Sequence, residues 1–141
     1  MHMIMATDYA IRVMLYLTVT QRMATSSEIS QKAKIPKQYL ITMSKKLKDA
    51  NLLVSYGGHT GGFLLARRPE EITLLDIVRV TENTSRMLPC MEADSDCGFC
   101  EPDGCAICKC LSRLQGDMDG YLKKTTLREL ADGAGGMAFA Q

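Results

Sequence analysis

Apolar side chains recur every three or four residues along most of the chain, which is the spacing of one face of an α-helix. The first such stretch, Met5–Thr20, is almost continuously apolar. It predicts a helix that is buried on most sides, with Thr7 as its N-cap and Asp8 in the first turn, where a carboxylate suits the helix dipole. A second, shorter helix is predicted within 24–33, because Thr25 opens a Thr-x-x-Glu capping box.

The clearest helical pattern runs over Lys37–Ala50. Pro36 separates it from the preceding helix, because the residue before a proline avoids the helical conformation. Asn51 follows as a residue that favours the end of a helix. One buried face is predicted for the apolar residues at helical spacing, namely Tyr39, Leu40, Met43, Leu47 and Ala50. Two helices joined by a four-residue break indicate a helix-turn-helix.

After residue 52 the pattern changes to that of short strands. Residues 53–56 and 63–66 are predicted as two strands, and the glycine-rich segment 57–62 joins them. A hairpin placed directly after a helix-turn-helix is called a wing. Glycines at its tip permit positive φ angles and a close approach to another backbone.

Two further helices are predicted in the second half of the chain. The first covers Thr73–Glu82, with Thr73 as its cap, and the second covers Leu111–Lys124. The last helix has an apolar stripe of Leu111, Leu114, Met118, Tyr121 and Leu122. This stripe either pairs with the same helix of a second chain, which we favour, or folds back onto its own domain.

The predicted fold class is therefore mainly α with a small β-hairpin. It consists of a winged helix-turn-helix domain, a cysteine loop and a C-terminal dimerisation helix. We expect the winged domain over 1–83 and a cysteine-rich loop over 84–110, because the central part of that segment loses all periodicity. The dimerisation helix and following segment occupy 111–130, and 131–141 is expected to be a flexible tail.

Composition narrows the class of protein. The chain has 141 residues, of which 46% are hydrophobic and 23% charged, as in an ordinary globular protein. No apolar run approaches the ~20 residues of a membrane span. The first ten residues lack the basic and apolar segments of a secretion signal. We therefore expect a cytoplasmic protein with no membrane association.

The distribution of charge indicates a partner. Residues 1–68 contain ten Lys and Arg against three Asp and Glu, whereas 69–141 contain seven against thirteen. A basic first half that holds a helix-turn-helix favours double-stranded DNA over the simpler interpretation that the lysines only solvate the surface. The candidate DNA contacts on the second helix and at the hairpin tip are Lys37, Gln38, Thr42, Lys45, Lys46, Gly58, His59 and Gly61.

All of the cysteines lie in one segment, at positions 90, 97, 100, 105, 108 and 110. Clustered thiols in a reducing compartment bind a metal or sense redox state. A pliable loop with proline and glycine suits an iron–sulfur cluster, and a small zinc site is the alternative. No strong acid–base or nucleophile constellation accompanies them, so we do not expect an enzyme.

The sequence also resembles a known family. The segments "TDYAIRVMLYL", "GGHTGGFLLARRPEEITL", the cysteine loop ending "DGC" and "TTLREL" are similar to those of the Rrf2 family of bacterial winged-helix transcription regulators, whose members include IscR, NsrR, RirA and CymR. The resemblance spans 5–130, and its N-terminal motif is most similar to that of NsrR. It implies a winged-helix homodimer joined by a long helix.

The resemblance further implies an iron–sulfur cluster, with 4Fe–4S favoured and 2Fe–2S as the other form. Cys90 and Cys105 match the first and third ligands, and either Cys97 or Cys100 matches the second. Asp8 matches a carboxylate that completes the cluster across the dimer, although it serves equally well as a helix-dipole residue. The implied function is a repressor or activator whose operator affinity responds to nitric oxide, redox state or iron. The alternative is a thiol- or zinc-responsive regulator without the cluster.

Overall fold

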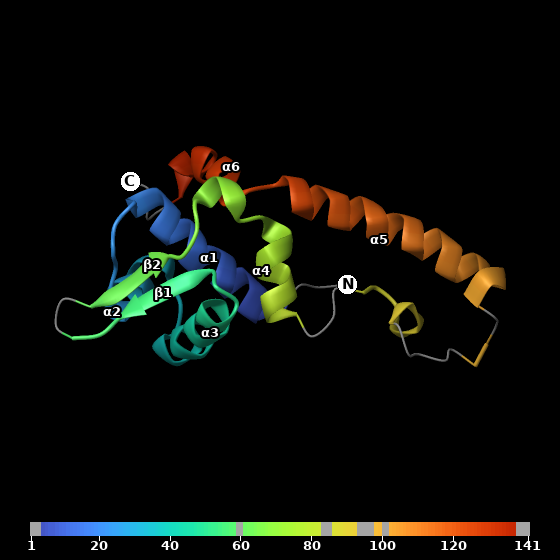
Figure 1. The fold of residues 1–141 in the computed structure, drawn as a ribbon, viewed down its shortest axis with the longest axis horizontal. Helices are drawn as coiled ribbons and strands as arrows, with labels where there is room; N and C mark the ends of the chain where they lie inside the picture. Colours follow the sequence, from blue (N-terminus) through green and yellow to red (C-terminus); the bar gives the residue numbers. More distant parts are fainter. Residues whose placement is uncertain (1–3, 59–60, 83–85, 93–97, 100–101, 138–141) are drawn as a thin grey trace.

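The computed structural model describes residues 4–58, 61–82, 86–92, 98–99 and 102–137. A bundle of short helices carries a two-stranded hairpin on one side, and one long helix projects away from it (Figure 1). This arrangement confirms the predicted fold class. Among the described residues, no helix is long and apolar enough to cross a membrane.

Helix α1 (Met5–Thr20) is the centre of the bundle and contacts α2, α3, α4 and α6. Its N-cap is Ile4, so the prediction of Thr7 as the cap was wrong. Thr7 is instead fully buried inside the helix, and its hydroxyl lies 2.7 Å from the hydroxyl of Thr81. The Thr7 hydroxyl therefore finds its hydrogen-bond partner on α4 and does not need a cap position to be satisfied.

Helices α2 (Ser26–Ala33) and α3 (Lys37–Asp49) form the predicted helix-turn-helix. Thr25 caps α2 by accepting a hydrogen bond from the Glu28 N–H at 3.2 Å. The capping box is only half formed, because the Glu28 carboxylate accepts hydrogen bonds from Tyr16 and Arg22 instead.

The buried face of α3 differs from the prediction at three positions. Tyr39 is 49% exposed and Ala50 is also exposed, whereas Ser44 is only 3% exposed. The physical reason at Tyr39 is a partner at the surface: its ring contacts the ring of Tyr9 on α1 in a tilted arrangement. Asn51, expected near the helix end, follows the C-cap Ala50 with a left-handed φ of 59°.

Strands β1 (Leu53–Tyr56) and β2 (Gly62–Leu65) pair antiparallel, with Leu53 opposite Leu65. The second strand begins one residue earlier than predicted. Phe63 also exchanges two backbone hydrogen bonds with Ala24, which attaches the hairpin to the start of the helix-turn-helix. A Cβ at Gly62 would lie 2.5 Å from the Ala24 carbonyl oxygen, so this close attachment requires glycine.

Helix α4 (Leu74–Thr81) starts with a complete capping box between Thr73 and Asp76. Helix α6 (Leu127–Asp132), which the sequence did not reveal, packs on α1 and buries Leu127 fully in the same core. The Leu127 N–H donates to the Ile72 carbonyl at 2.9 Å. The predicted tail therefore begins inside α6, and the following turn buries Ala134.

Helix α5 (Ala106–Lys124) begins five residues before the predicted Leu111, so Cys108 and Cys110 lie in a helix and not in a loop. Its C-terminal end packs against α4, where Leu122 contacts Leu75 and Val78. Figure 1 shows that its N-terminal end lies far from the winged domain.

Candidate nucleic-acid interface and metal centre

The outer face of α3 carries the predicted contact residues, which are Lys37, Gln38, Thr42, Lys45 and Lys46; all of these are exposed. Lys37 Nζ lies 3.3 Å from Ser27 Oγ, so this side chain reaches back to the start of α2. Thr42 donates to the Gln38 carbonyl at 3.3 Å. Gln38 itself is exposed at the N-terminal end of this polar face, as a groove-reading helix requires.

The predicted DNA contacts leave out two exposed residues of α3. Ile41 is 59% exposed between Gln38 and Lys45, and Lys48 is exposed one turn further along. Their signal was present in the sequence as helical spacing, but an isoleucine is usually assigned to a core. Ile41 therefore adds an apolar side chain to an otherwise polar face.

The hairpin lies beside α3 and extends the same face. Lys48 Nζ lies 3.5 Å from Ser55 Oγ on β1, which links the helix to the strand. At the tip, Gly58 is exposed and has a φ of 87°, a conformation that favours glycine. Gly61 is half-buried. His59 lies outside the described residues.

Asp8 begins a row of contacts that ends on α3. Its carboxylate forms an ion pair with Arg12 at 2.8 Å, one turn along α1. The Arg12 guanidinium lies over the Tyr9 ring, 5.8 Å from its centroid, and donates to the Ala33 carbonyl at the end of α2. Tyr9 in turn stacks on Tyr39. Through these contacts, Asp8 is connected to both helices of the helix-turn-helix.

A second polar cluster fixes α2 against α1. Glu28 accepts hydrogen bonds from Arg22 and from the Tyr16 hydroxyl, the latter at 2.7 Å. Hydrogen bonding from Arg22 lowers the pKa of Glu28 to about 2, whereas burial and the Glu28 carboxylate raise the pKa of Tyr16. Glu28 therefore stays ionised and holds the start of α2 in place.

Cys105 occupies a distinctive position at the start of α5. It is 8% exposed and is the N-cap residue, and its Sγ accepts a hydrogen bond from the Cys108 N–H at 3.3 Å. A helix N-terminus favours negative charge, so a thiolate that ligates a metal here would be stabilised by the α5 dipole. Cys108 is half-buried and Cys110 is exposed.

Cys90 lies in a segment that runs along α5 toward Cys105. The Met87 N–H donates to Gln115 Oε1 at 2.8 Å. Met91 then lines a polar cavity of about 230 Å³ together with Cys108. Cys108 lies two turns before Gln115, nearer the start of α5. Cys90 is half-buried in the 3-10 helix Pro89–Met91, which contacts α5.

The described structure does not bring the predicted ligands together as one site. Cys97 and Cys100 lie outside the described residues, and Asp8 is on α1 of the winged domain. Among the described residues, no three His, Cys, Asp or Glu side chains come together as a metal site. The donor chemistry of Cys90 and Cys105 nevertheless fits a thiolate-bound cluster, because both are shielded and Cys105 has an N–H donor to its sulfur.

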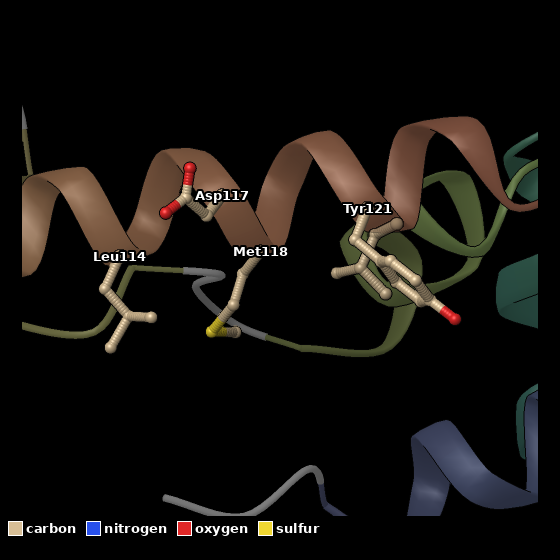
Figure 2. A pocket seen from close by; sticks show the side chains of 5 residues that line it. Leu114, Asp117, Met118 and Tyr121 are labelled. Atoms are coloured by element: carbon tan, nitrogen blue, oxygen red, sulfur yellow. The ribbon is translucent and has the colours of Figure 1, made fainter.

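The apolar stripe of α5 is uncovered over its middle. Leu114 is 44% and Tyr121 is 71% exposed, and with Met118 they line an open cavity of about 370 Å³. Figure 2 shows these three side chains on the same side of the helix. Leu122, also predicted in this stripe, is buried against α4 instead.

Comparison with known proteins identifies relatives of this architecture. The model of the Rrf2 family, described as an iron-dependent transcriptional regulator, matches residues 4–133. Protein aau3 of Rhizobium meliloti is 31% identical over 119 residues, covering 82% of this chain and 77% of that protein. The HTH-type transcriptional regulator NsrR of Bacillus subtilis is 26% identical over 126 residues, covering 88% and 86%. The structure of CymR, the global cysteine regulator of B. subtilis, superposes with a TM-score of 0.79 at 24% identity, covering 94% and 98%.

Proposed function

Because the chain belongs to the Rrf2 family and is a transcriptional regulator rather than an enzyme, we propose that it acts as a homodimer on double-stranded operator DNA in the cytoplasm, under the control of an iron–sulfur cluster. The observation that carries this proposal is the position of Cys105. Its thiol caps the helix that bears the uncovered apolar stripe and that ends against the winged domain.

The exposed face of α3 provides the DNA contacts. Gln38 is at the end that enters the major groove, where its amide matches the edge of adenine in two hydrogen bonds. Lys37, Lys45 and Lys46 bind guanine or phosphate, and Thr42 adds a hydroxyl. The hairpin tip, with Gly58, His59 and Gly61, reaches the neighbouring minor groove or its phosphates.

The α5 stripe provides the dimer contact. Leu114, Met118 and Tyr121 leave an apolar surface in water, and pairing with the same helix of a second chain would bury it. A two-fold dimer then presents two winged domains to two operator half-sites.

The cluster would be held by Cys90, Cys105 and either Cys97 or Cys100, with Asp8 of the partner subunit as the fourth ligand of a 4Fe–4S form; a 2Fe–2S form is the other candidate. When bound, such a group supplies iron that reacts with nitric oxide or oxidants. A carboxylate is a hard and weakly held ligand for this iron, which leaves one corner open to a signal molecule.

The residues around Asp8 connect this site to the DNA face. In the described chain Arg12 holds the Asp8 carboxylate, packs on Tyr9 and binds the end of α2. If the Asp8 carboxylate binds the cluster, Arg12 loses its ion-pair partner on α1. The Tyr9–Tyr39 stacking then transmits a change of Arg12 to α3, so that cluster occupancy and operator affinity become linked.

Purification without oxygen, followed by an absorption spectrum and analysis for iron, sulfide and zinc, tests this proposal. A brown protein with iron and sulfide supports it. A colourless protein with one zinc per chain would instead support the zinc-responsive alternative. A colourless, metal-free protein whose DNA binding changes on thiol oxidation would support the thiol-responsive alternative.

A further inference from the structure

Ser44 on α3 has an unusual environment. Among the described residues, its Oγ is the one buried side-chain nitrogen or oxygen that lacks a hydrogen-bond partner. The residue is only 3% exposed. A buried hydroxyl without a partner destabilises a fold, because its hydrogen bonds to water are lost and not replaced. Such a group therefore calls for a ligand or a structural reason.

Ser44 lines a cavity of about 360 Å³ that we call the Ser44 cavity. The cavity lies where three elements meet: α3, the first residue of α2 and the hairpin. Ser26 of α2 lines the cavity, as do Ser55 of β1 and Phe63 of β2. Three separate parts of the winged domain thus converge on one unpaired hydroxyl.

The start of α2 adds hydrogen-bond donors and positive charge to this cavity. The first N–H groups of an α-helix have no partner within the helix. Thr25 accepts a hydrogen bond from the N–H of Glu28. None of the described hydrogen bonds is donated by the N–H groups of Ser26 and Ser27. The positive end of the α2 dipole coincides with these two donors.

Charged and apolar side chains complete the lining. Lys45 and Lys48 are exposed at the rim, and their two positive charges exceed the single negative charge of Asp49. Ile41 and Phe63 contribute an apolar wall. A ligand that matches this lining has an anionic group next to an apolar one, which is the character of the sugar–phosphate unit of a nucleic acid.

We propose that the Ser44 cavity binds one backbone phosphate of double-stranded DNA, with Ser44 Oγ and the N–H groups of Ser26 and Ser27 donating to its oxygens. The neighbouring deoxyribose packs against Ile41 and Phe63. The hydroxyl is covered in the unbound protein, so the exposed side chains of Lys45 and Lys48 shift when the phosphate enters. This inference rests on the proposed DNA-binding function.

Ser44→Ala provides a test with two measurements, DNA affinity and thermal stability, which we do not expect to fall together. A phosphate contact is independent of base sequence, so the probe is a mixed-sequence DNA duplex at low salt. We expect the variant to bind this duplex about ten-fold more weakly, as for loss of a hydrogen bond to a charged group. Its thermal unfolding temperature should stay the same or rise, because an unsatisfied hydroxyl is removed. Unchanged affinity for the duplex overturns the inference.

Thr18→Val is the matched control. Thr18 is also a buried hydroxyl residue, but it donates to the Met14 carbonyl within α1, away from the cavity. Its substitution should leave DNA affinity unchanged. Lys48→Ala should weaken binding and reduce the slope of log affinity against log salt by about 0.9, as expected for one lost phosphate contact. An unchanged slope removes the lysine from the site and overturns the phosphate assignment.

Failure of this inference is distinguishable from failure of the proposed function. If the wild-type protein does not bind the duplex at all, the proposed function fails and the inference with it. If the wild type and Ser44→Ala bind the duplex equally, only the inference fails. Amide NMR signals of Ser26 and Ser27 should shift with the duplex. A shift with inorganic phosphate alone, and none with DNA, would identify a free-anion site and overturn the DNA assignment.

Discussion

Tyr9 on α1 and Tyr39 on α3 form a tilted ring contact, with ring centroids 5.8 Å apart and ring planes at 51°. The pair joins the helix that carries Asp8 to the helix that carries the candidate DNA contacts. Because the Arg12 guanidinium lies over the same Tyr9 ring and pairs with Asp8, a change at Asp8 has a direct physical route to α3.

Tyr39→Ala should weaken the dependence of operator binding on the cluster. Without the ring, a change at Arg12 no longer reaches α3, so the ratio of operator affinities with and without cluster should move toward one. Titrations of both forms with the same duplex measure this ratio. Tyr39→Phe keeps the ring and should retain the wild-type ratio; equal ratios in both variants would rule out the stacking as the link.

Substitutions on α3 should separate sequence reading from general attraction. Gln38→Ala should lose roughly 1–3 kcal/mol of preference between operator and scrambled DNA, because a bidentate contact to one base is removed. Lys46→Ala should weaken binding to both sequences and flatten its salt dependence. Competition assays at two salt concentrations distinguish the two effects. A Gln38→Ala protein with wild-type preference would remove Gln38 from the reading residues.

The cysteine segment has its own matched pair of variants. Cys90→Ala and Cys105→Ala should each lose iron and sulfide, since both thiols are assigned as ligands. Cys110→Ala should keep them, because Cys110 is exposed on the side of α5. Asp8→Ala should retain the cluster but change its spectrum or its reactivity. Full cluster occupancy in Cys90→Ala and Cys105→Ala would falsify the ligand assignment.

Dimerisation should depend on the uncovered side of α5. Met118→Asp places a charge in the middle of the apolar stripe, where burial in a dimer would remove it from water. We expect a monomer by light scattering at concentrations where the wild type is a dimer. Lys109→Asp introduces the same carboxylate at an exposed position on the opposite side of the helix and should remain dimeric. A dimeric Met118→Asp protein would move the interface elsewhere.

Acid should destabilise the fold through Glu28. Hydrogen bonding lowers the pKa of this carboxyl from 4.5 to about 2 in the folded chain, so the folded state prefers the ionised form. Its stabilisation is complete above the unfolded value and is lost as pH falls from about 4.5 to about 2. Urea unfolding of the wild type and Glu28→Gln should differ by on the order of 1–2 kcal/mol near neutral pH. This difference should shrink across that range; a constant difference contradicts the assignment.

The elements with strong local signals were predictable from the sequence. The apolar period placed α1 and α3, and the caps Thr25 and Thr73 marked the starts of α2 and α4. The missed features depend on distant partners. Helix α6 has only six residues, too few to show a helical period, although Thr126 caps it and Thr126-x-x-Glu129 has the same spacing as the cap of α2. Its position on the core depends on the hydrogen bond from Leu127 to Ile72, which no local pattern encodes.

The candidate site was predictable by residue type more than by geometry. The basic face of α3 followed from helical spacing, and the clustered thiols followed from their positions. The early start of α5 did not, because a cysteine sulfur that caps a helix replaces the usual hydroxyl or carboxylate signal. Nor did the burial of Ser44 or the exposure of Tyr39, since both depend on how α3 packs against its neighbours.

The attachment of α5 at one end has a consequence for the operator itself. The Leu74 N–H donates to the Thr125 carbonyl at 2.9 Å, and the bond from Leu127 to Ile72 follows directly. The winged domain is therefore fixed to the end of α5 and must turn when that helix turns. In a dimer built on α5, the crossing angle of the two helices sets the distance between the two DNA-reading helices. Half-sites on B-DNA lie one turn, about 34–36 Å, or a multiple of one turn apart, so the length of the operator spacer would report that crossing angle.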